Sequence, residues 1–316
     1  MLPVVRLFPA GNVRFSINME TVMLIDIHTH ASECTGFTRP SGSRYPTLAE
    51  YIDMLDAKGI DKAVLLCSVS PELRYVLVTP FEVLAMAAQH PDRIIPFCSV
   101  DPRMMANTIK ADFRPMLRYF QDRGCKGIGE YLPNIDLDHP LNMNLFAQVE
   151  EIGLPLTFHL ASTKDHQGQY GCYDDLGLPR LEKVLQAFPK LKFLAHSQVF
   201  WAEISADVTL ENRSAYPKGP VQPGRAVELL RKYPNLYGDL SAGSGFNAIA
   251  RDQAFGDAFL AEFADRLLFG TDIANVPQDT PLVAYFQKLR VEGRISPETA
   301  EKIAWKNANR LLGLGL

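Results

Sequence analysis

The hydrophobic positions of the chain form short apolar runs, and each run is followed by a longer segment whose apolar residues recur at helical spacing. Strands that alternate with helices indicate βαβ units and therefore a parallel sheet. Eight runs predict strands, over residues 24–28, 63–69, 93–100, 126–130, 155–159, 192–196, 235–240 and 266–270. The intervening segments predict helices over residues 47–58, 80–90, 105–123, 142–152, 178–188, 224–232, 248–263 and 280–290.

Eight strand–helix units in about 250 residues predict an α/β protein with a (β/α)8 TIM barrel. A doubly wound open sheet is the alternative, but it usually has a glycine-rich turn after its first strand, where this chain has His28-Thr29-His30. We expect one domain over residues 1–316, with an N-terminal extension over 1–22 and a C-terminal helix within 295–316. The long irregular stretch 197–223 is expected to be a lid or a subunit contact.

Composition narrows the class of protein. Of the 316 residues, 47% are hydrophobic and 22% are charged, which is typical of a globular domain with a large core. The formal net charge is −4, so we expect neither a nucleic acid nor a membrane as partner, because both favour clustered basic surfaces. A small-molecule substrate is the expected partner, and self-association into a homo-oligomer is left open.

Cysteine usage and the N-terminus bear on the compartment. The five cysteines include no C-x-x-C pair, and Cys67 and Cys98 lie in strand-like runs, where core packing is expected. Pro3 and Pro9 interrupt the first residues of the chain, and no apolar run approaches the ~20 residues of a membrane span. These features predict a cytoplasmic protein without a signal peptide or a transmembrane helix.

Two histidines mark the end of the first predicted strand. Residues two apart on a strand point to the same side, so the imidazoles of His28 and His30 are expected to project together. Zn²⁺ accepts imidazole nitrogens at about 2.0–2.1 Å, and two such ligands supply half of a tetrahedral shell. Taken alone, the pair is equally well explained as two hydrogen-bonded polar histidines.

Other predicted strands also end in groups that bind metals. His159 and His196 end the fifth and sixth strands, and Asp272 follows the eighth. The carboxyl ends of all strands in a parallel barrel open on one face, which is where active sites lie. We therefore expect these side chains to meet His28 and His30 at one rim.

Three further carboxylates lie at strands. Glu130 ends the fourth strand and is a candidate metal ligand, general base or partner of an imidazole N–H, although a salt bridge to a loop would also satisfy it. Asp26 and Asp239, the latter with Ser241 nearby, either orient a ligand or serve packing alone.

These motifs together resemble the amidohydrolase superfamily, from about residue 23 to the end of the chain. The motifs are Ile25-Asp26-Ile27-His28-Thr29-His30, the strand-end His159 and His196, and Gly270-Thr271-Asp272. The tail over residues 297–303 and 307–314 is similar to the amidohydrolase-related branch, which includes the aminocarboxymuconate-semialdehyde decarboxylase-like proteins.

The resemblance implies a ligand set. By it, His28, His30, His159 and Asp272 bind one divalent metal ion, usually zinc, and His196 is a catalytic group beside the metal or a ligand of a second ion. Many superfamily members carry a carboxylated lysine on strand four that bridges two metals. Here Glu130 is near that place and Lys126 is at the start of the strand, which favours a single ion or a glutamate-assisted site over a lysine-bridged pair of ions.

The expected reaction is hydrolysis of a small ester, lactone or amide by a metal-activated water, whose pKa a divalent ion lowers to near 7. Asp272 would transfer the proton, and His196 would stabilise the oxyanion. The alternatives are decarboxylation or hydration of an unsaturated or aromatic carboxylic acid, and a non-catalytic metal-binding scaffold. Candidate contacts to a small organic acid are the loop residues Arg44, Tyr45, Tyr131, Trp201 and Arg225.

Overall fold

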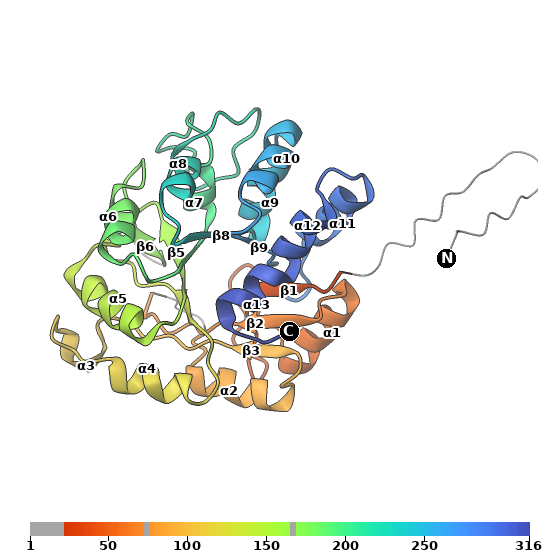
Figure 1. The fold of residues 1–316 in the computed structure, drawn as a ribbon. Helices are drawn as coiled ribbons and strands as arrows, with labels where there is room; N and C mark the ends of the chain where they lie inside the picture. The colour runs from red at the N-terminus through yellow and green to blue at the C-terminus, as the bar shows by residue number, and fades with distance from the viewer. Residues whose placement is uncertain (1–21, 73–75, 165–168) are drawn as a thin grey trace, which may run out of the picture.

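The computed structural model describes residues 22–72, 76–164 and 169–316, and its strands follow one another around a barrel (Figure 1). All pairs of neighbouring strands are parallel. The strands are β1 (Ile25–Thr29), β2 (Lys62–Leu65), β3 (Ile94–Pro96), β4 (Ile128–Tyr131), β5 (Leu156–Ala161), β6 (Cys172–Tyr173), β7 (Phe193–His196), β8 (Leu236–Asp239) and β9 (Leu267–Leu268).

Backbone contacts join the strands into a ring. One sheet has the order β1-β2-β3 and the other β4-β5-β7-β8-β9, with β6 paired to the end of β5. Parallel bridges from Cys98 to Ile128 and from Thr29 to Ile273 connect the two sheets at both edges. This is the predicted TIM barrel, and the two-residue β6 is an addition that the hydrophobic pattern did not indicate.

The helices lie outside the strands and end at local signals. Thr47 and Glu50 form a capping box at the start of α1, and Gly59 ends it in a left-handed conformation. The helices are α1 (Leu48–Lys58), α2 (Pro80–Gln89), α3 (Met104–Asn107), α4 (Arg114–Gln121), α5 (Pro140–Ile152), α6 (Pro179–Ala187), α7 (Gln198–Ala202), α8 (Arg225–Lys232), α9 (Ala242–Ala250), α10 (Gln253–Glu262), α11 (Pro281–Val291), α12 (Pro297–Glu301), the π-helical η1 (Lys302–Lys306) and α13 (Asn307–Leu312).

Two helix predictions were wrong in extent. Residues 108–113 are not helical, because Gln148 accepts the N–H of Phe113, and α4 begins at Arg114 with Pro115 in its first turn. The segment predicted as one helix over 248–263 is divided between α9 and α10, because the Asp252 carboxylate accepts the N–H of Phe255 and starts a new helix. The stretch 197–223 is irregular except for α7 at its start.

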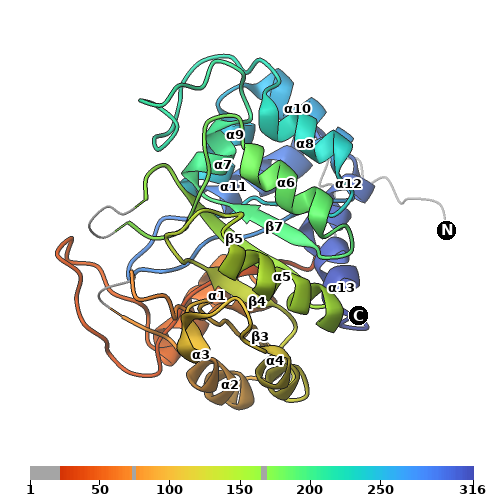
Figure 2. The same ribbon diagram turned by 90° about the vertical axis from the view of Figure 1, so that its left-hand side faces the viewer.

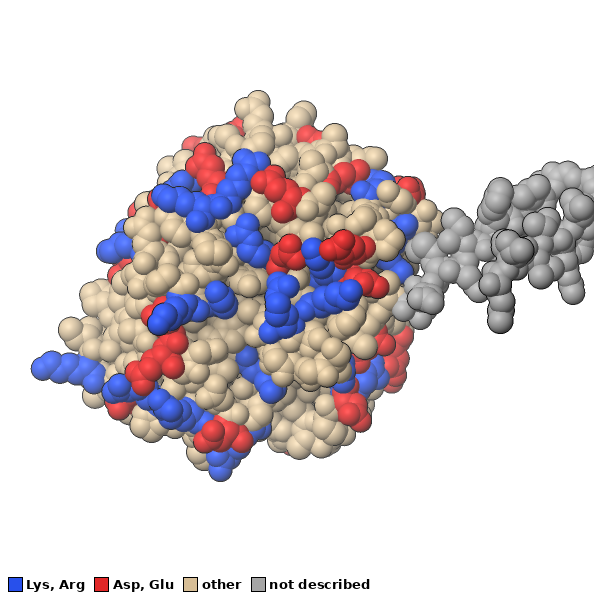
Figure 3. Space-filling view, in the orientation of Figure 1, with Lys and Arg blue, Asp and Glu red and all other residues tan. Residues whose placement is uncertain are grey.

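The burial of the cysteines and the distribution of surface charges can be compared with what the composition predicts. Cys67 and Cys98 are buried in the core as predicted, and all five cysteines are free thiols. No helix within residues 22–72, 76–164 and 169–316 is long and apolar enough to cross a membrane. On the face seen in Figure 3, Lys and Arg side chains are interspersed with Asp and Glu, so no large basic surface forms there.

The barrel has two different ends. The long connection after β1 extends from one end, and α13 lies at the opposite end (Figure 2). Buried Ala308 and Leu312 of α13 pack with strand side chains such as Ile25 and Ile27 in one hydrophobic cluster. The end opposite α13 therefore carries the loops that follow the strands, and the candidate site lies there.

Candidate metal centre

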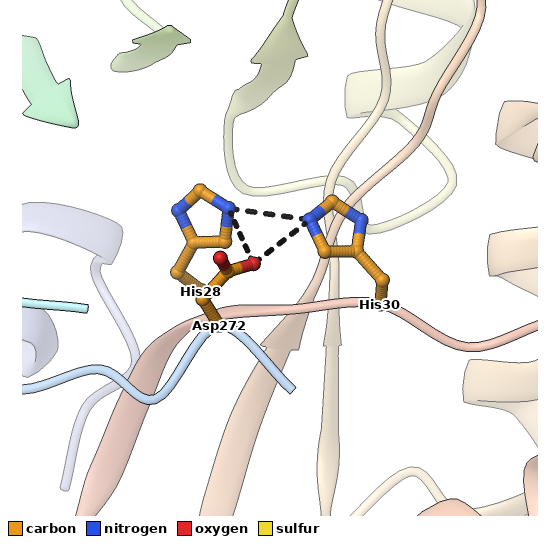
Figure 4. A group of neighbouring side chains, drawn as sticks. All are labelled: His28, His30 and Asp272. Atoms are coloured by element: carbon orange, nitrogen blue, oxygen red, sulfur yellow. Dashed lines mark hydrogen bonds and ion pairs between the residues drawn. The ribbon is translucent and has the colours of Figure 1, made fainter. Parts of the chain in front are cut away.

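Two histidines and an aspartate converge at the carboxyl end of β1 (Figure 4). The Nε2 atoms of His28 and His30 are 3.2 Å apart. Oδ1 of Asp272 lies 3.6 Å from each of these nitrogens. Both imidazoles are buried, whereas 27% of the Asp272 side chain is exposed. The predicted pairing of His28 with His30 is thus present, and Asp272 completes a three-residue cluster.

A buried carboxylate holds the ring of His28. Oδ2 of Asp239, at the end of β8, accepts a hydrogen bond from His28 Nδ1 at 2.6 Å. Its other oxygen accepts the N–H of Ser241 at 3.0 Å. Burial alone would lower the pKa of His28, but the Asp239 charge outweighs it and raises the pKa to about 10. In the neutral ring the hydrogen bond to Asp239 keeps the proton on Nδ1, so that Nε2, which is turned toward His30 and Asp272, has a lone pair to offer a metal ion.

Asp26 has a different role from Asp239. Its carboxylate accepts the backbone N–H groups of His28 and Thr271 and the Thr271 hydroxyl, so it joins the ends of β1 and β9. Asp26 makes no hydrogen bond to an imidazole among the described residues. Asp272 follows this junction in a left-handed conformation, with φ of 56°, and its N–H donates to the carbonyl of His28.

Glu130 lies between the two groups of histidines. Its Oε2 is 3.5 Å from His30 Nε2, and its Oε1 is 3.9 Å from His28 Nε2. Oε1 also accepts a hydrogen bond from His159 Nδ1 at 2.9 Å. Burial raises the pKa of Glu130, but the surrounding histidines outweigh this effect and hold the pKa well below its usual range.

His159 and His196 form the far side of the site. Together with Glu130 they make a second group of potential ligands beside that of His28, His30 and Asp272, and a third group of His28, His196 and Asp239 overlaps both sides. The His159 ring therefore contacts the carboxylate of Glu130 in this structure. The His196 Nδ1 lies 2.9 Å from the Ser241 hydroxyl, and burial lowers the pKa of His196 to about 3.

The donor atoms suit a divalent metal. Imidazole nitrogens and carboxylate oxygens bind zinc and manganese in proteins. The His28 ring is held by a second carboxylate, as ligand imidazoles usually are. Nδ1 of His30 is buried and has no hydrogen-bond partner within the described part of the chain, so Nε2 carries its main polar contacts. The residues present thus fit one divalent ion among His28, His30 and Asp272.

An arginine that the sequence did not point to lies at the mouth of the site. Its guanidinium, from Arg39, stands 4.5 Å over the ring of Tyr45, which in turn stacks on His30 at 5.5 Å. Arg39 donates hydrogen bonds to Ala274 O at 3.2 Å and Asn275 Oδ1 at 2.5 Å. Among residues 22–72, 76–164 and 169–316 it forms no ion pair with a carboxylate.

Most of the predicted loop contacts lie elsewhere. Arg44 forms a double hydrogen bond with Glu50, and Arg225 pairs with Glu182 and Glu228, so both positive charges are neutralised. The hydroxyl of Tyr131 is buried against Asn142, and the Trp201 indole donates to the backbone of Asp239. Of the five, Tyr45 alone stacks on a histidine of the metal cluster.

A comparison with family models decides the kinship of the chain. The model described as Amidohydrolase matches residues 25–314. The chain belongs to the amidohydrolase family. The resemblance seen in the sequence is thereby confirmed, and the protein is a metal-dependent enzyme of this family. No curated protein matches the chain by sequence.

Solved structures show the same fold at low sequence identity. The chain is similar to 2,6-dihydroxybenzoate decarboxylase from Rhizobium, with a TM-score of 0.59, 16% identity and coverage of 94% of this chain and 100% of that one. It is also similar to a dihydroxybenzoic acid decarboxylase from Polaromonas with bound manganese and the inhibitor 2-nitroresorcinol. The TM-score is 0.56 and the identity 16%, over 94% of this chain and 98% of that one. A third similar structure is a probable 2-pyrone-4,6-dicarboxylic acid hydrolase from Acinetobacter baumannii with citric acid bound. Its TM-score is 0.56 and its identity 14%, over 92% of this chain and 99% of that one.

Proposed function

We propose that this enzyme decarboxylates a small, flat carboxylic acid with the help of one divalent ion, either zinc or manganese. The observation that carries the proposal is Arg39, a half-buried cation at the mouth of the metal cluster whose hydrogen-bond partners are all neutral. A guanidinium in such a place binds carboxylates strongly, because its N–H groups match the two carboxylate oxygens.

The walls of the site support an unsaturated or aromatic acid. The Tyr45 ring is nearly parallel to His30, with 12° between the planes, and Tyr170 lies 4.9 Å from the His159 ring. Aromatic rings favour flat partners that stack on them. The two similar decarboxylases act on dihydroxylated benzoic acids, as their names state, which agrees with this shape.

The chain's own residues divide the work of such a reaction. His28, His30 and Asp272 would hold the ion, with Glu130 and His159 completing its surroundings. When bound, a divalent ion acts as a Lewis acid that polarises an oxygen of the substrate. Arg39 orients the carboxylate over Tyr45. The bond between the ring and the carboxyl carbon breaks, its electron pair stays on the ring carbon, and carbon dioxide leaves.

Two groups are placed to act after this bond breaks, one on the proton that the ring carbon takes up and one on the charge. Asp272 is the partly exposed carboxyl of the cluster, so it can deliver a proton to the substrate side. His196 is held by the hydroxyl of Ser241 and is buried behind the His28 ring, at 4.2 Å between ring centres. His196 therefore stabilises charge beside the ligands without facing solvent.

Hydrolysis of an ester, lactone or amide, the reaction expected from the sequence, is the second candidate. One similar structure is described as a probable hydrolase of a pyrone dicarboxylic acid. A divalent ion held by the same cluster would lower the pKa of a water molecule and make it a nucleophile for hydrolysis. An ester or lactone that also carries a carboxylate, as a pyrone dicarboxylic acid does, would use Arg39 in the same way, and an assay of products separates the two reactions.

The test uses the zinc-loaded and the manganese-loaded protein. Benzoic and unsaturated acids are assayed for carbon dioxide release, and lactones and esters of matched size for acid release. We expect carbon dioxide from at least one acid, and acid release alone would favour hydrolysis. Arg39→Gln should lower kcat/KM about 10- to 100-fold, as expected for a hydrogen bond to a charged group. Arg44→Gln is the matched control, because Glu50 already neutralises it; equal effects of the two changes would contradict the role of Arg39.

A further inference from the structure

We propose that Tyr216 forms one wall of a substrate subsite beside Asp272, where its hydroxyl binds a hydroxyl group on the acid, and that buried Arg213 holds it there. The inference rests on the proposed function, since it concerns the part of the same acid that does not react. It assigns a role to the stretch 197–223, which the sequence marked only as a lid or a subunit contact.

A small cavity of about 210 Å³ opens next to Asp272. Tyr216 and Gly243 line one side, and Asn275, Asp279 and Leu282 are among the residues that line the rest. Ligand pockets usually enclose about 300–1,000 Å³, so this space suits a substituent or the edge of one ring, not a second ring system. Asn275 also accepts the hydrogen bond of Arg39, so the cavity adjoins the place proposed for the carboxylate.

Tyr216 meets the cavity with a free polar group. Its side chain is about half exposed, and its hydroxyl has no hydrogen-bond partner among the described residues. A Cβ atom on Gly243 would lie 3.2 Å from this hydroxyl, so the glycine at the start of α9 leaves the tyrosine just enough room. The hydroxyl is therefore available to a ligand in the cavity.

The charges around the cavity select the kind of substituent. Asp272 and Asp279 both line the cavity, and none of the described residues that line it is a lysine or an arginine. A second carboxylate would be repelled here, whereas a neutral hydroxyl can donate to a carboxylate and accept from Tyr216. The subsite thus favours a hydroxylated monocarboxylic acid over a dicarboxylic acid.

Arg213, three positions before Tyr216, fastens the stretch to the barrel. Its side chain is 1% exposed, and it pairs with the equally buried Glu203 at 3.2 Å. It also donates to the carbonyl groups of Asp174 and Asp175, at 3.0 and 3.2 Å. A buried ion pair with these extra hydrogen bonds resists opening, because separating it leaves an unpaired charge away from water. The stretch is therefore a fixed wall in this region, and Arg213 is a positioning residue.

The test measures binding, so that it does not depend on turnover. Zinc-loaded protein is titrated by calorimetry with benzoate, 3-hydroxybenzoate and benzene-1,3-dicarboxylate. We expect the wild type to prefer 3-hydroxybenzoate. Tyr216→Phe should lower the affinity for 3-hydroxybenzoate about 3- to 10-fold, which corresponds to the loss of one hydrogen bond, and should leave the affinity for benzoate unchanged. Tyr216→Ala should lower the affinity for both benzoate and 3-hydroxybenzoate, because the wall of the subsite is lost. Leu210→Ala, an exposed position on the same stretch, is the control and should change neither.

Arg213→Lys tests the positioning role, because lysine cannot reproduce the planar fork of hydrogen bonds. Arg213→Lys should weaken the binding of benzoate and of 3-hydroxybenzoate as Tyr216→Ala does, and it should leave the zinc content unchanged. Adding Tyr216→Phe to Arg213→Lys should not change the preference between the two acids any further. If Tyr216→Phe weakens both probes equally, or neither, the subsite is refuted while the proposed function stands. If the wild type binds none of the three acids, the proposed function fails and the subsite fails with it.

Discussion

The hydrogen bond between Asp239 and His28 gives the sharpest prediction about the metal cluster. Asp239→Asn preserves the size of the side chain but removes its charge. In the wild type both carboxylate oxygens accept, one from the Ser241 N–H and one from His28 Nδ1. An asparagine has one accepting oxygen, so its NH₂ must face one of these two donors. The conflict is relieved when His28 moves its proton to Nε2, which is the atom that faces the metal site.

The magnitude follows from the burial of the pair. Both side chains are 0% exposed, so water does not replace the lost contact. A hydrogen bond to a charged group contributes about 1.5–3 kcal/mol, and each 1.4 kcal/mol is a factor of ten. Loss of a carboxylate partner of a ligand imidazole typically lowers metal affinity about 10- to 100-fold. We therefore expect zinc affinity to fall by about this factor in Asp239→Asn.

The assay is a competition titration of zinc between the protein and a chromophoric chelator, with metal content measured in parallel. Asp26→Asn is the matched control. Asp26 is equally buried, but it holds backbone N–H groups and the hydroxyl of Thr271, which can turn to accept from an asparagine NH₂. Its zinc affinity should stay close to that of the wild type. If Asp239→Asn binds zinc as tightly as the wild type, Asp239 does not set the tautomer of His28.

Three further changes probe the site and its surroundings. His159→Ala should reduce bound metal well below one equivalent while the fold is retained. The change removes a predicted ligand and leaves the buried Glu130 carboxylate without its hydrogen-bond partner. Full metal occupancy would remove His159 from the ligand set. His196→Asn should keep the metal but lower turnover about 10²- to 10⁴-fold, and unchanged turnover would exclude it from the mechanism. Asp174 is a buried carboxyl away from the cluster, and burial raises its pKa to about 7. Asp174 binds its proton more tightly in the folded protein than in the unfolded chain. The free energy of unfolding therefore falls as pH rises from about 4 to 7, by on the order of 1 kcal/mol per pH unit at most. Denaturant unfolding of Asp174→Asn should lack this slope, and parallel pH profiles of the two proteins would contradict it.

The strand pattern and the ends of the strands could be predicted from the sequence because both are local properties. Alternation along β1 brings His28 and His30 together whatever the rest of the chain does, and the barrel then collects the groups that end other strands. The helix error at Asp252 arose where a side-chain cap competed with helical periodicity. At residues 108–113 the competing group was Gln148, which is 35 positions away from Phe113 in the sequence.

The partners of the loop side chains could not be predicted in this way. Arg39 and Arg44 are five positions apart and look alike in the sequence, yet Glu50 neutralises Arg44, while Arg39 reaches Asn275 on a distant loop. Tyr216 lines the cavity because Arg213 is anchored to residues that precede it by nearly 40 positions. The sequence by itself therefore determined the barrel and the type of centre, because periodic patterns act within one strand or helix. Only the tertiary structure decided which charges are neutralised and which face the substrate, because that depends on the loops that fold against one another.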